Sequence, residues 1–146
     1  MNKVLLDTDV ILDFLFNREP FAEYATRVIG LCEEKKISGY ITPVICSNLY
    51  YLLRQTGSHM KTVNSLKQLL LITGVLTMDK DVVNQALHSN FKDFEDALQY
   101  YAAIRSGKID TIITRNLKDY AFSKIGVLTP EAYIKLYNSS QINLNY

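Results

Sequence analysis

The sequence has little net charge, few cysteines and no long apolar stretch, and each of these absences excludes a class of protein. Its 146 residues include 16 basic and 15 acidic side chains, which gives a formal net charge of +1. No overall field therefore attracts nucleic acid, and any such binding must come from a local patch of charge. Hydrophobic residues make up 48% of the chain, which excludes a disordered protein and is enough for the single core expected at this length.

The two cysteines, Cys32 and Cys46, are far apart in the sequence and do not form a C-x-x-C pair. Such thiols are typical of buried, reduced cysteines in a cytosolic protein. Asp7 interrupts the first apolar residues too early for a secretory signal, and no apolar run approaches the roughly 20 residues of a membrane span. The sequence therefore predicts a soluble, cytoplasmic protein with no membrane segment.

Short apolar segments alternate with helical patterns over most of the chain. Strands are predicted at residues 4–6, 39–42, 75–78, 111–114 and 126–128. Helices are predicted at residues 9–16, 20–32, 43–54, 63–70, after the N-cap Asp79, from the N-cap Asp93 to Arg105, and from Pro130. We find no hairpin signal, repeat or low-complexity linker. This alternation predicts an α/β fold in which helices cover both faces of a parallel sheet.

Ligands of an open parallel sheet bind beyond the carboxyl ends of its strands, so polar residues there are the first candidates for a site. Asp7 ends the first predicted strand, and Asn116 and Asp119 follow the fourth. Asp96 lies in the first turn of the helix before the fourth strand, and Asn48 lies on the helix that leaves the second. These five side chains are therefore the candidates for a single site.

Acids that converge in one crevice favour a divalent cation. Two ionised carboxylates about 4 Å apart repel each other by roughly 4 kcal/mol at an effective dielectric constant of about 20. Such a cluster either takes up a proton or binds a cation. Mg²⁺ prefers oxygen ligands and keeps several waters, which further acids can orient.

Each candidate also has a structural interpretation, which the sequence leaves open. Asp7 can cap the helix that follows it, and Asp96 can stabilise a helix N-terminus that is capped by Asp93. Asp119 can be an ordinary loop acid, and Asn48 can be a structural polar residue.

Three segments, in this order, resemble the PIN domain family. Residues 5–13 (LLDTDVILD) look like its opening strand and first acid, and residues 94–103 (FEDALQYYAA) resemble the helix that carries its third acid. Residues 113–120 (ITRNLKDY) resemble its closing Thr-Arg-Asn…Asp-Phe segment, with Tyr120 in the Phe position. The order of elements fits the family over residues 1–137, which implies one domain there, and the polar residues 138–146 are predicted to form a tail. The resemblance also implies a three-layer α/β/α arrangement with a parallel sheet of four to five strands.

The resemblance implies a metal-dependent endoribonuclease that uses Mg²⁺ or Mn²⁺ to hydrolyse a phosphodiester of RNA. Such a protein is often the toxin of a toxin–antitoxin pair, so an antitoxin protein and a homodimer are expected partners. Carried over by position, Asp7 and Asp96 are the central metal-binding acids, Asp119 completes the site, and Asn116 is a nearby oxygen donor. Basic side chains near this site are candidates for contacts with phosphate: Arg18, Arg115 and Lys118.

One departure from the family pattern leaves an alternative open. The family usually has Glu where this chain has Asn48, so the site has one negative charge fewer. The alternative is a degenerate PIN domain that binds RNA or a protein partner without cutting. A phosphatase of the haloacid-dehalogenase type is a further alternative, because Asp7-Thr8-Asp9 follows an apolar strand. That motif prefers Thr or Val where this chain has Ile11, and no separate downstream Lys and acidic pair are evident.

Overall fold

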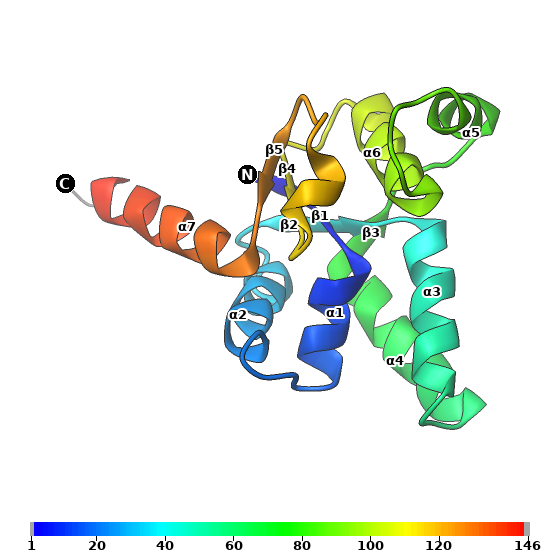
Figure 1. The fold of residues 1–146 in the computed structure, drawn as a ribbon. Coiled ribbons are helices and arrows are strands. Elements are labelled where there is room, and N and C mark those ends of the chain that lie inside the picture. The colour runs from blue at the N-terminus through cyan, green and yellow to red at the C-terminus, as the bar shows by residue number, and fades with distance from the viewer. Residues whose placement is uncertain (1, 145–146) are drawn as a thin grey trace.

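The computed structural model describes residues 2–144, which contain one five-stranded parallel sheet (Figure 1). The strands lie in the order β3-β2-β1-β4-β5, and every neighbouring pair is parallel. Their bounds are β1 Lys3–Leu6, β2 Ser38–Ile41, β3 Thr73–Val75, β4 Thr111–Ile113 and β5 Gly126–Leu128. The α/β class predicted from the sequence is confirmed.

Helices cover both faces of this sheet. The described residues form α1 Thr8–Leu15, α2 Ala22–Glu33, α3 Pro43–Arg54, α4 His59–Ile72, α5 Lys80–Leu87, α6 Phe94–Ser106, the 3₁₀ helix η1 Leu117–Tyr120, and α7 Pro130–Leu144. In Figure 1, α1 to α4 lie below the sheet, and α5 and α6 lie above it. This is the three-layer α/β/α arrangement that was predicted. None of the helices within residues 2–144 is long and apolar enough to cross a membrane.

β1 lies at the centre of the sheet and of the core. Val4, Leu5 and Leu6 are fully buried, as a strand covered on both faces requires. Leu5 is in register with Tyr40 on one side and with Ile112 on the other. The strands beside β1 therefore come from opposite halves of the chain. This arrangement brings the segment after β1 next to the segment after β4.

α2 packs close to the sheet because β2 has a glycine where the two meet. A Cβ atom on Gly39 would lie 2.6 Å from Cys32 Sγ and 3.3 Å from Leu6 Cδ1. Both of these neighbours are buried, so neither can swing into solvent. Only a residue without a side chain allows this distance between helix and sheet.

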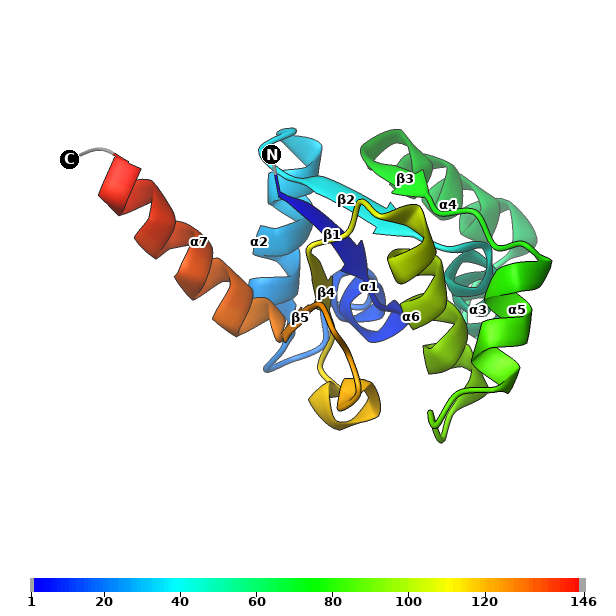
Figure 2. The ribbon, with the colours of Figure 1, turned by 90° about the horizontal axis from the view of Figure 1, so that it is seen from above.

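Helix ends differ by a few residues from the sequence prediction, as where α2 begins at Ala22 and not at Pro20, and two other elements differ more. The third strand was predicted at residues 75–78, but β3 ends at Val75, and Leu76, whose N–H still donates to Ile41 O of β2 at 2.8 Å, packs in the core. The last helix continues past Asn138, where a polar tail was expected, because neither glycine nor proline interrupts it. Figure 2 shows α7 extending away from the sheet. Residues 145–146 of the expected tail lie outside the described residues.

Candidate functional site

A crevice forms where the strand order reverses, beside β1. The chain goes from β1 to β2 and β3 on one side, and the later strands β4 and β5 lie on the other. Asp7 follows β1 directly, and its backbone N–H donates to Ile113 O of β4 at 3.0 Å. Ligands of α/β sheets bind at such a switch point, outside the carboxyl ends of the strands.

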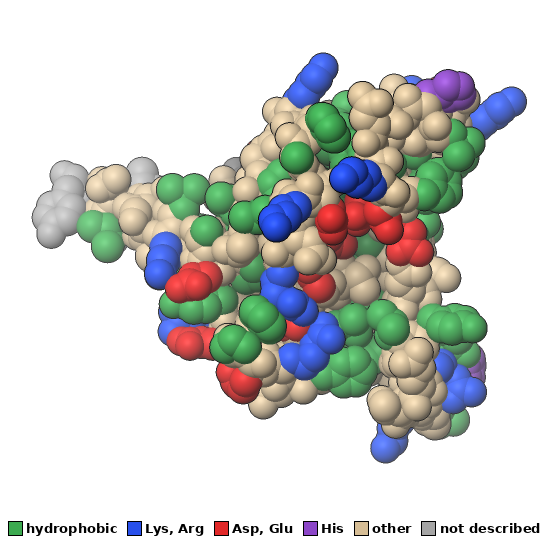
Figure 3. Space-filling view, viewed as in Figure 1, with side chains coloured by type: hydrophobic (Ala, Val, Ile, Leu, Met, Phe, Trp, Pro, Cys, Tyr) green, Lys and Arg blue, Asp and Glu red, His purple; other side chains and the backbone are tan. Residues whose placement is uncertain are grey.

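A cavity of about 560 Å³ occupies this position. Its walls are Asp7, Thr8, Asp9, Leu12, Arg18, Asn48, Tyr51, Leu52, Asp93, Glu95, Asp96, Gln99, Arg115, Asn116 and Asp119. Figure 3 shows acidic side chains gathered on this face of the molecule, with Lys and Arg side chains around them. All five predicted site residues line the cavity, and so do Arg18 and Arg115. Lys118 does not, and it lines a neighbouring hollow instead.

Asp7 is almost fully buried, and both of its oxygens accept hydrogen bonds. Thr8 N donates to Oδ1 at 2.8 Å, which makes Asp7 the N-cap of α1, and Thr114 Oγ1 donates to Oδ2 at 2.9 Å. Burial raises the pKa of Asp7, and the charge of Asp119 adds to this, while the hydrogen bonds from Thr114, Thr8 and Tyr120 lower it. The residue is therefore both a helix cap and a wall of the cavity.

Asp96 lies in the first turn of α6, which begins at the N-cap Asp93. Asp93 Oδ1 accepts from Asp96 N at 3.0 Å, so the backbone of this turn is fixed. Burial raises the pKa of Asp96 from 3.8 to about 7, and the negative charges of Asp7, Asp93 and Asp119 contribute in the same direction. Carboxylates from three elements thus repel one another across the cavity.

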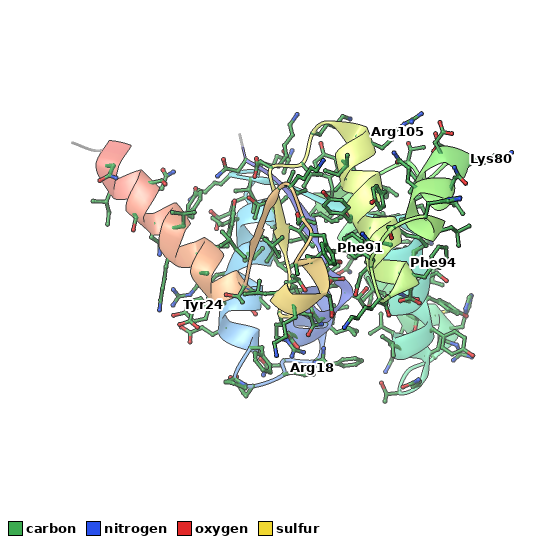
Figure 4. All side chains as sticks on the ribbon, turned by 45° about the horizontal axis from the view of Figure 1, so that its top comes forward. Arg18, Tyr24, Lys80, Phe91, Phe94 and Arg105 are labelled. Atoms are coloured by element: carbon green, nitrogen blue, oxygen red, sulfur yellow. The ribbon has the colours of Figure 1, made fainter. Side chains whose placement is uncertain are left out.

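The buried hydroxyl of Tyr120 lies between two of these acids. It is 3.4 Å from Asp7 Oδ2 and 3.5 Å from Asp96 Oδ1, and its single proton can serve one of them at a time. Burial and the charges of Asp7 and Asp96 raise the pKa of Tyr120 far above its usual range, so it stays a neutral donor. Figure 4 shows Phe91 between α6 and η1, where its ring lies 6.1 Å from that of Tyr120.

Asp9 is a wall of the cavity that sequence analysis did not include among the site residues. Its Oδ2 accepts from Arg115 N at 3.2 Å and from Asn116 Nδ2 at 3.1 Å. Its Oδ1 is buried and has no hydrogen-bond partner among the described residues. Burial, followed by the charge of Asp7, raises the pKa of Asp9 to about 6. The Asp-Thr-Asp motif was the available signal, but it was considered only for a phosphatase.

Asp13 is the second residue that was missed, and it holds both predicted arginines. The Asp13 side chain is fully buried. Arg115 donates to it through Nε at 2.6 Å and Nη2 at 3.2 Å, and Arg18 Nε lies 2.9 Å from Oδ1. The Arg115 guanidinium also lies over the ring of Phe21, 4.0 Å from its centroid. Asp13 is four residues after Asp9 on α1, a spacing that puts both on one helix face.

Asn48 and Glu95 meet at the wall of the cavity. Asn48 Nδ2 donates to Glu95 Oε2 at 2.9 Å, which joins α3 to the first turn of α6. A second, fully buried bond joins the same helices, because Thr42 Oγ1 donates to Gln99 Oε1. Glu95 was not a candidate from the sequence, which names Asn48 as a site candidate but does not predict that the two side chains meet.

The donor set suits a hard divalent cation, although the side chains do not already surround one. In residues 2–144, no three Asp, Glu, His or Cys side chains are grouped closely enough to hold a metal ion as they stand. The cavity walls nevertheless include six carboxylates, and these give only the oxygen donors that Mg²⁺ and Mn²⁺ prefer. The raised pKa of Asp96 and the unpartnered Oδ1 of Asp9 are both features that a bound cation would relieve.

Comparison with known proteins identifies the family. A sequence model of the PIN domain matches residues 3–118. The chain belongs to the PIN domain family. It is 28% identical over 142 residues to a protein named ribonuclease VapC1 of Aquifex aeolicus (strain VF5), and the match covers 94% of this chain and 96% of that protein. The family resemblance drawn from the three sequence segments is therefore confirmed.

Solved structures of other proteins share the fold. VapBC-1 of nontypeable Haemophilus influenzae superposes with a TM-score of 0.65 at 12% identity, over 88% of this chain and 98% of that one. A toxin–antitoxin complex from Klebsiella pneumoniae gives a TM-score of 0.63 at 22% identity, over 87% and 97% of the two chains. At these identities the likeness concerns the fold, so the roles of individual residues in this PIN domain stay predictions.

Proposed function

We propose that this PIN domain is a divalent-cation-dependent endoribonuclease and the toxin of a toxin–antitoxin pair. The observation that carries the proposal is the acidic cavity at the carboxyl ends of β1 and β4, in which mutual repulsion helps to raise the pKa of Asp96 to about 7. Similarity to a protein named a ribonuclease and to toxin–antitoxin structures supports the same activity.

Asp7, Asp96 and Asp119 would hold the cation, which we propose to be Mg²⁺ or Mn²⁺. When bound, a divalent cation makes a water molecule nucleophilic near neutral pH and offsets the negative charge of the phosphate. The chain itself fixes the acids: Thr114 and the backbone of Thr8 orient Asp7, and the Asp93 cap sets the turn that carries Asp96. Without a cation the six carboxylates would repel a phosphodiester, so the cavity suits RNA only in the loaded state.

Arg115 is placed to contact the phosphate while it remains bound to Asp13. A guanidinium has five N–H donors in a fixed plane, and Asp13 accepts from only two of the N–H groups of Arg115. Because the other donors stay available beside the cavity, Arg115 can bind a phosphate oxygen without breaking its ion pair. Arg18 borders the same cavity, and Lys118 in the adjacent hollow can contact the next phosphate along the strand.

The deciding experiment measures cleavage of single-stranded RNA and binding of Mn²⁺ by the same protein samples. The parent should bind Mn²⁺ in calorimetry and cut RNA, and EDTA should abolish the cutting. Asp7→Asn and Asp96→Asn should each weaken both properties. Glu33→Gln, which removes an exposed carboxylate far from the cavity, is the matched control and should change neither. Cleavage that continues in EDTA would reject the metal-dependent mechanism.

A PIN domain that binds RNA without cutting is the second candidate, and Asn48 is the observation that favours it. The family usually has a carboxylate at this position, and its absence can leave a cation too weakly held for catalysis. The two candidates separate on one measurement. A binder should shift RNA in a gel at micromolar protein in Mn²⁺, yet leave the strand intact after prolonged incubation.

Partners follow from the same proposal. We infer that an antitoxin protein covers the acidic cavity, as a toxin active on cellular RNA in the cytoplasm requires a means of restraint. We also infer a symmetric homodimer, because the chain has 10 tyrosines, a residue type enriched at interfaces. Light scattering at micromolar concentration should give twice the chain mass of 16.7 kDa. A monomeric mass would reject the homodimer and leave the nuclease proposal standing.

A further inference from the structure

The contact between Asn48 and Glu95 places a carboxylate beside the position where the family usually has one. Asn48 is half-buried on α3, and Glu95 is exposed in the first turn of α6, and both line the cavity. The amide of Asn48 donates to Glu95 Oε2 at 2.9 Å. The negative charge expected at position 48 is therefore present within one hydrogen-bond length, on a different helix.

The frame behind this pair is rigid. Thr42 is the N-cap of α3, and its hydroxyl accepts from Ile45 N while it donates to the side chain of Gln99. Thr42 and Gln99 are both almost completely buried, so their bond fixes the start of α3 against the first turns of α6. Glu95 lies four residues before Gln99, on the same face of α6. Asn48 and Glu95 are therefore held opposite each other by the fold.

We propose that Glu95 supplies the carboxylate that position 48 lacks and serves as the fourth acid of the cation site. The proposal rests on the proposed function, since it takes the cavity to be the place where a divalent cation binds. In this arrangement Asn48 is a positioning residue. Its amide holds the Glu95 carboxylate along the cavity wall. Without this hydrogen bond, the exposed Glu95 side chain would extend into solvent.

The charge of the cavity supports this role. Its walls include two arginines against six carboxylates, and both arginines are already paired with Asp13, which lies outside the walls. Exchanging Asn48 and Glu95 between the two helices would leave the number of negative charges unchanged. The attraction of the site for a divalent cation is therefore retained, although the α3 carboxylate is absent.

A merely structural role for Glu95 is the competing explanation. An acid in the first turn of a helix interacts favourably with the helix dipole and stabilises α6 whether or not a cation binds. The two roles differ in what they change. A dipole role affects the melting temperature without added cation, whereas a role at the cation site affects the affinity for Mn²⁺ and the rise in melting temperature that Mn²⁺ causes.

The test removes the carboxylate from position 95 and then restores one at position 48. Glu95→Gln should weaken Mn²⁺ binding in calorimetry by about tenfold or more, the scale seen when groups that support a metal site are removed. The double variant Asn48→Glu with Glu95→Gln should recover most of the affinity that Glu95→Gln loses. In it the new carboxylate at position 48 accepts from the new amide at position 95. Glu33→Gln, remote from the cavity, should bind Mn²⁺ as the parent does.

Two results would overturn the inference, and they are distinguishable. If Glu95→Gln binds Mn²⁺ like the parent while Asp7→Asn loses it, Glu95 is only a helix acid and the nuclease proposal survives. If the parent itself fails to bind Mn²⁺, the cation site is wrong and both proposals fall. Because Glu95 is exposed, its replacement does not threaten folding, which circular dichroism of each variant would verify.

Discussion

Asp13 binds Arg115 through two parallel contacts, Nε to Oδ2 at 2.6 Å and Nη2 to Oδ1 at 3.2 Å. The carboxylate is fully buried on α1, and the arginine directly follows Thr114, just beyond β4. Their bond ties the first helix to the segment that carries Asn116 and Asp119. Asp13 therefore positions a wall residue of the candidate site without lining the cavity itself.

Asp13→Asn should destabilise the protein by about 2–3 kcal/mol, because it removes the charge-assisted hydrogen bonds of a fully buried carboxylate, while the guanidiniums left behind are 28% and 41% exposed and stay partly solvated. Urea unfolding followed by circular dichroism measures this. Glu131→Gln, which breaks the exposed i,i+4 pair with Lys135, is the control and should cost about 0.5 kcal/mol or less. A loss below about 1 kcal/mol for Asp13→Asn would show that the buried pair is not what holds this region.

The stability of the protein without cation should fall as the pH rises from about 4 to about 7. The pKa of Asp96 is raised to about 7 and that of Asp9 to about 6, while both are near 3.8 when unfolded. Between these values the folded state holds more protons than the unfolded chain, so the free energy of unfolding decreases with pH. Above pH 7 this contribution no longer changes.

Asp96→Asn should remove the upper part of that slope. At pH 8 in EDTA the variant should melt at the same temperature as the parent or higher, because it relieves repulsion from Asp7, Asp93 and Asp119. Thermal melts at a series of pH values measure both effects. A large loss of melting temperature at pH 8 would instead show that Asp96 is a structural acid of α6.

Tyr120→Phe should lower the stability of the cation-free protein by about 1 kcal/mol, since it removes the only hydroxyl placed between Asp7 and Asp96 in the described part of the chain. Mn²⁺ should bind at least as tightly as in the parent, because the bound cation offsets the repulsion between Asp7 and Asp96 that the hydroxyl reduces in the cation-free protein. Thermal melts with and without Mn²⁺ give both numbers. Loss of Mn²⁺ binding would show that the hydroxyl is needed to arrange the two acids.

Gly39→Ala should destabilise the protein by about 1–3 kcal/mol, because the new methyl group would lie 2.6 Å from Cys32 Sγ. Combining it with Cys32→Ala, which removes that sulfur, should recover part of the loss, and a double-mutant cycle measures the coupling. Gly30→Ala is the control. A Cβ there meets nothing within 4 Å, and its position inside α2 should make the variant more stable by about 0.5–1 kcal/mol.

Much of the fold could be predicted because local chemistry decides it. The buried apolar run of β1 is typical of a parallel strand. Asp93 and Gly107 mark the ends of α6, and Gly107 has the left-handed φ of 65° that favours glycine at this place. β3 was misplaced because it is a half-exposed edge strand of three residues. The longer apolar run that follows Gly74 gave the stronger local signal, although Leu76 packs in the core just beyond the end of β3.

The site was predictable only where a strand end or a family motif marked it. Asp7, Asp96 and Asn116 lie at a strand end or in a family motif, and in the structure all three line one cavity. Asp13 binds Arg115, which lies 102 positions away in the sequence, and Glu95 binds Asn48, which lies 47 positions away. Spacing along the chain does not predict either pair. Their roles depend on which elements the sheet order brings together.

The central place of β1 has a consequence for how a copy of this protein is made. β1 is synthesised first, but its neighbour β4 begins at Thr111, and Asp119 and Tyr120 come later still. A growing chain that has reached α6 already carries Asp7 and Asp96, yet nothing has closed the crevice between them. The cavity can therefore assemble only when almost the whole domain has been synthesised.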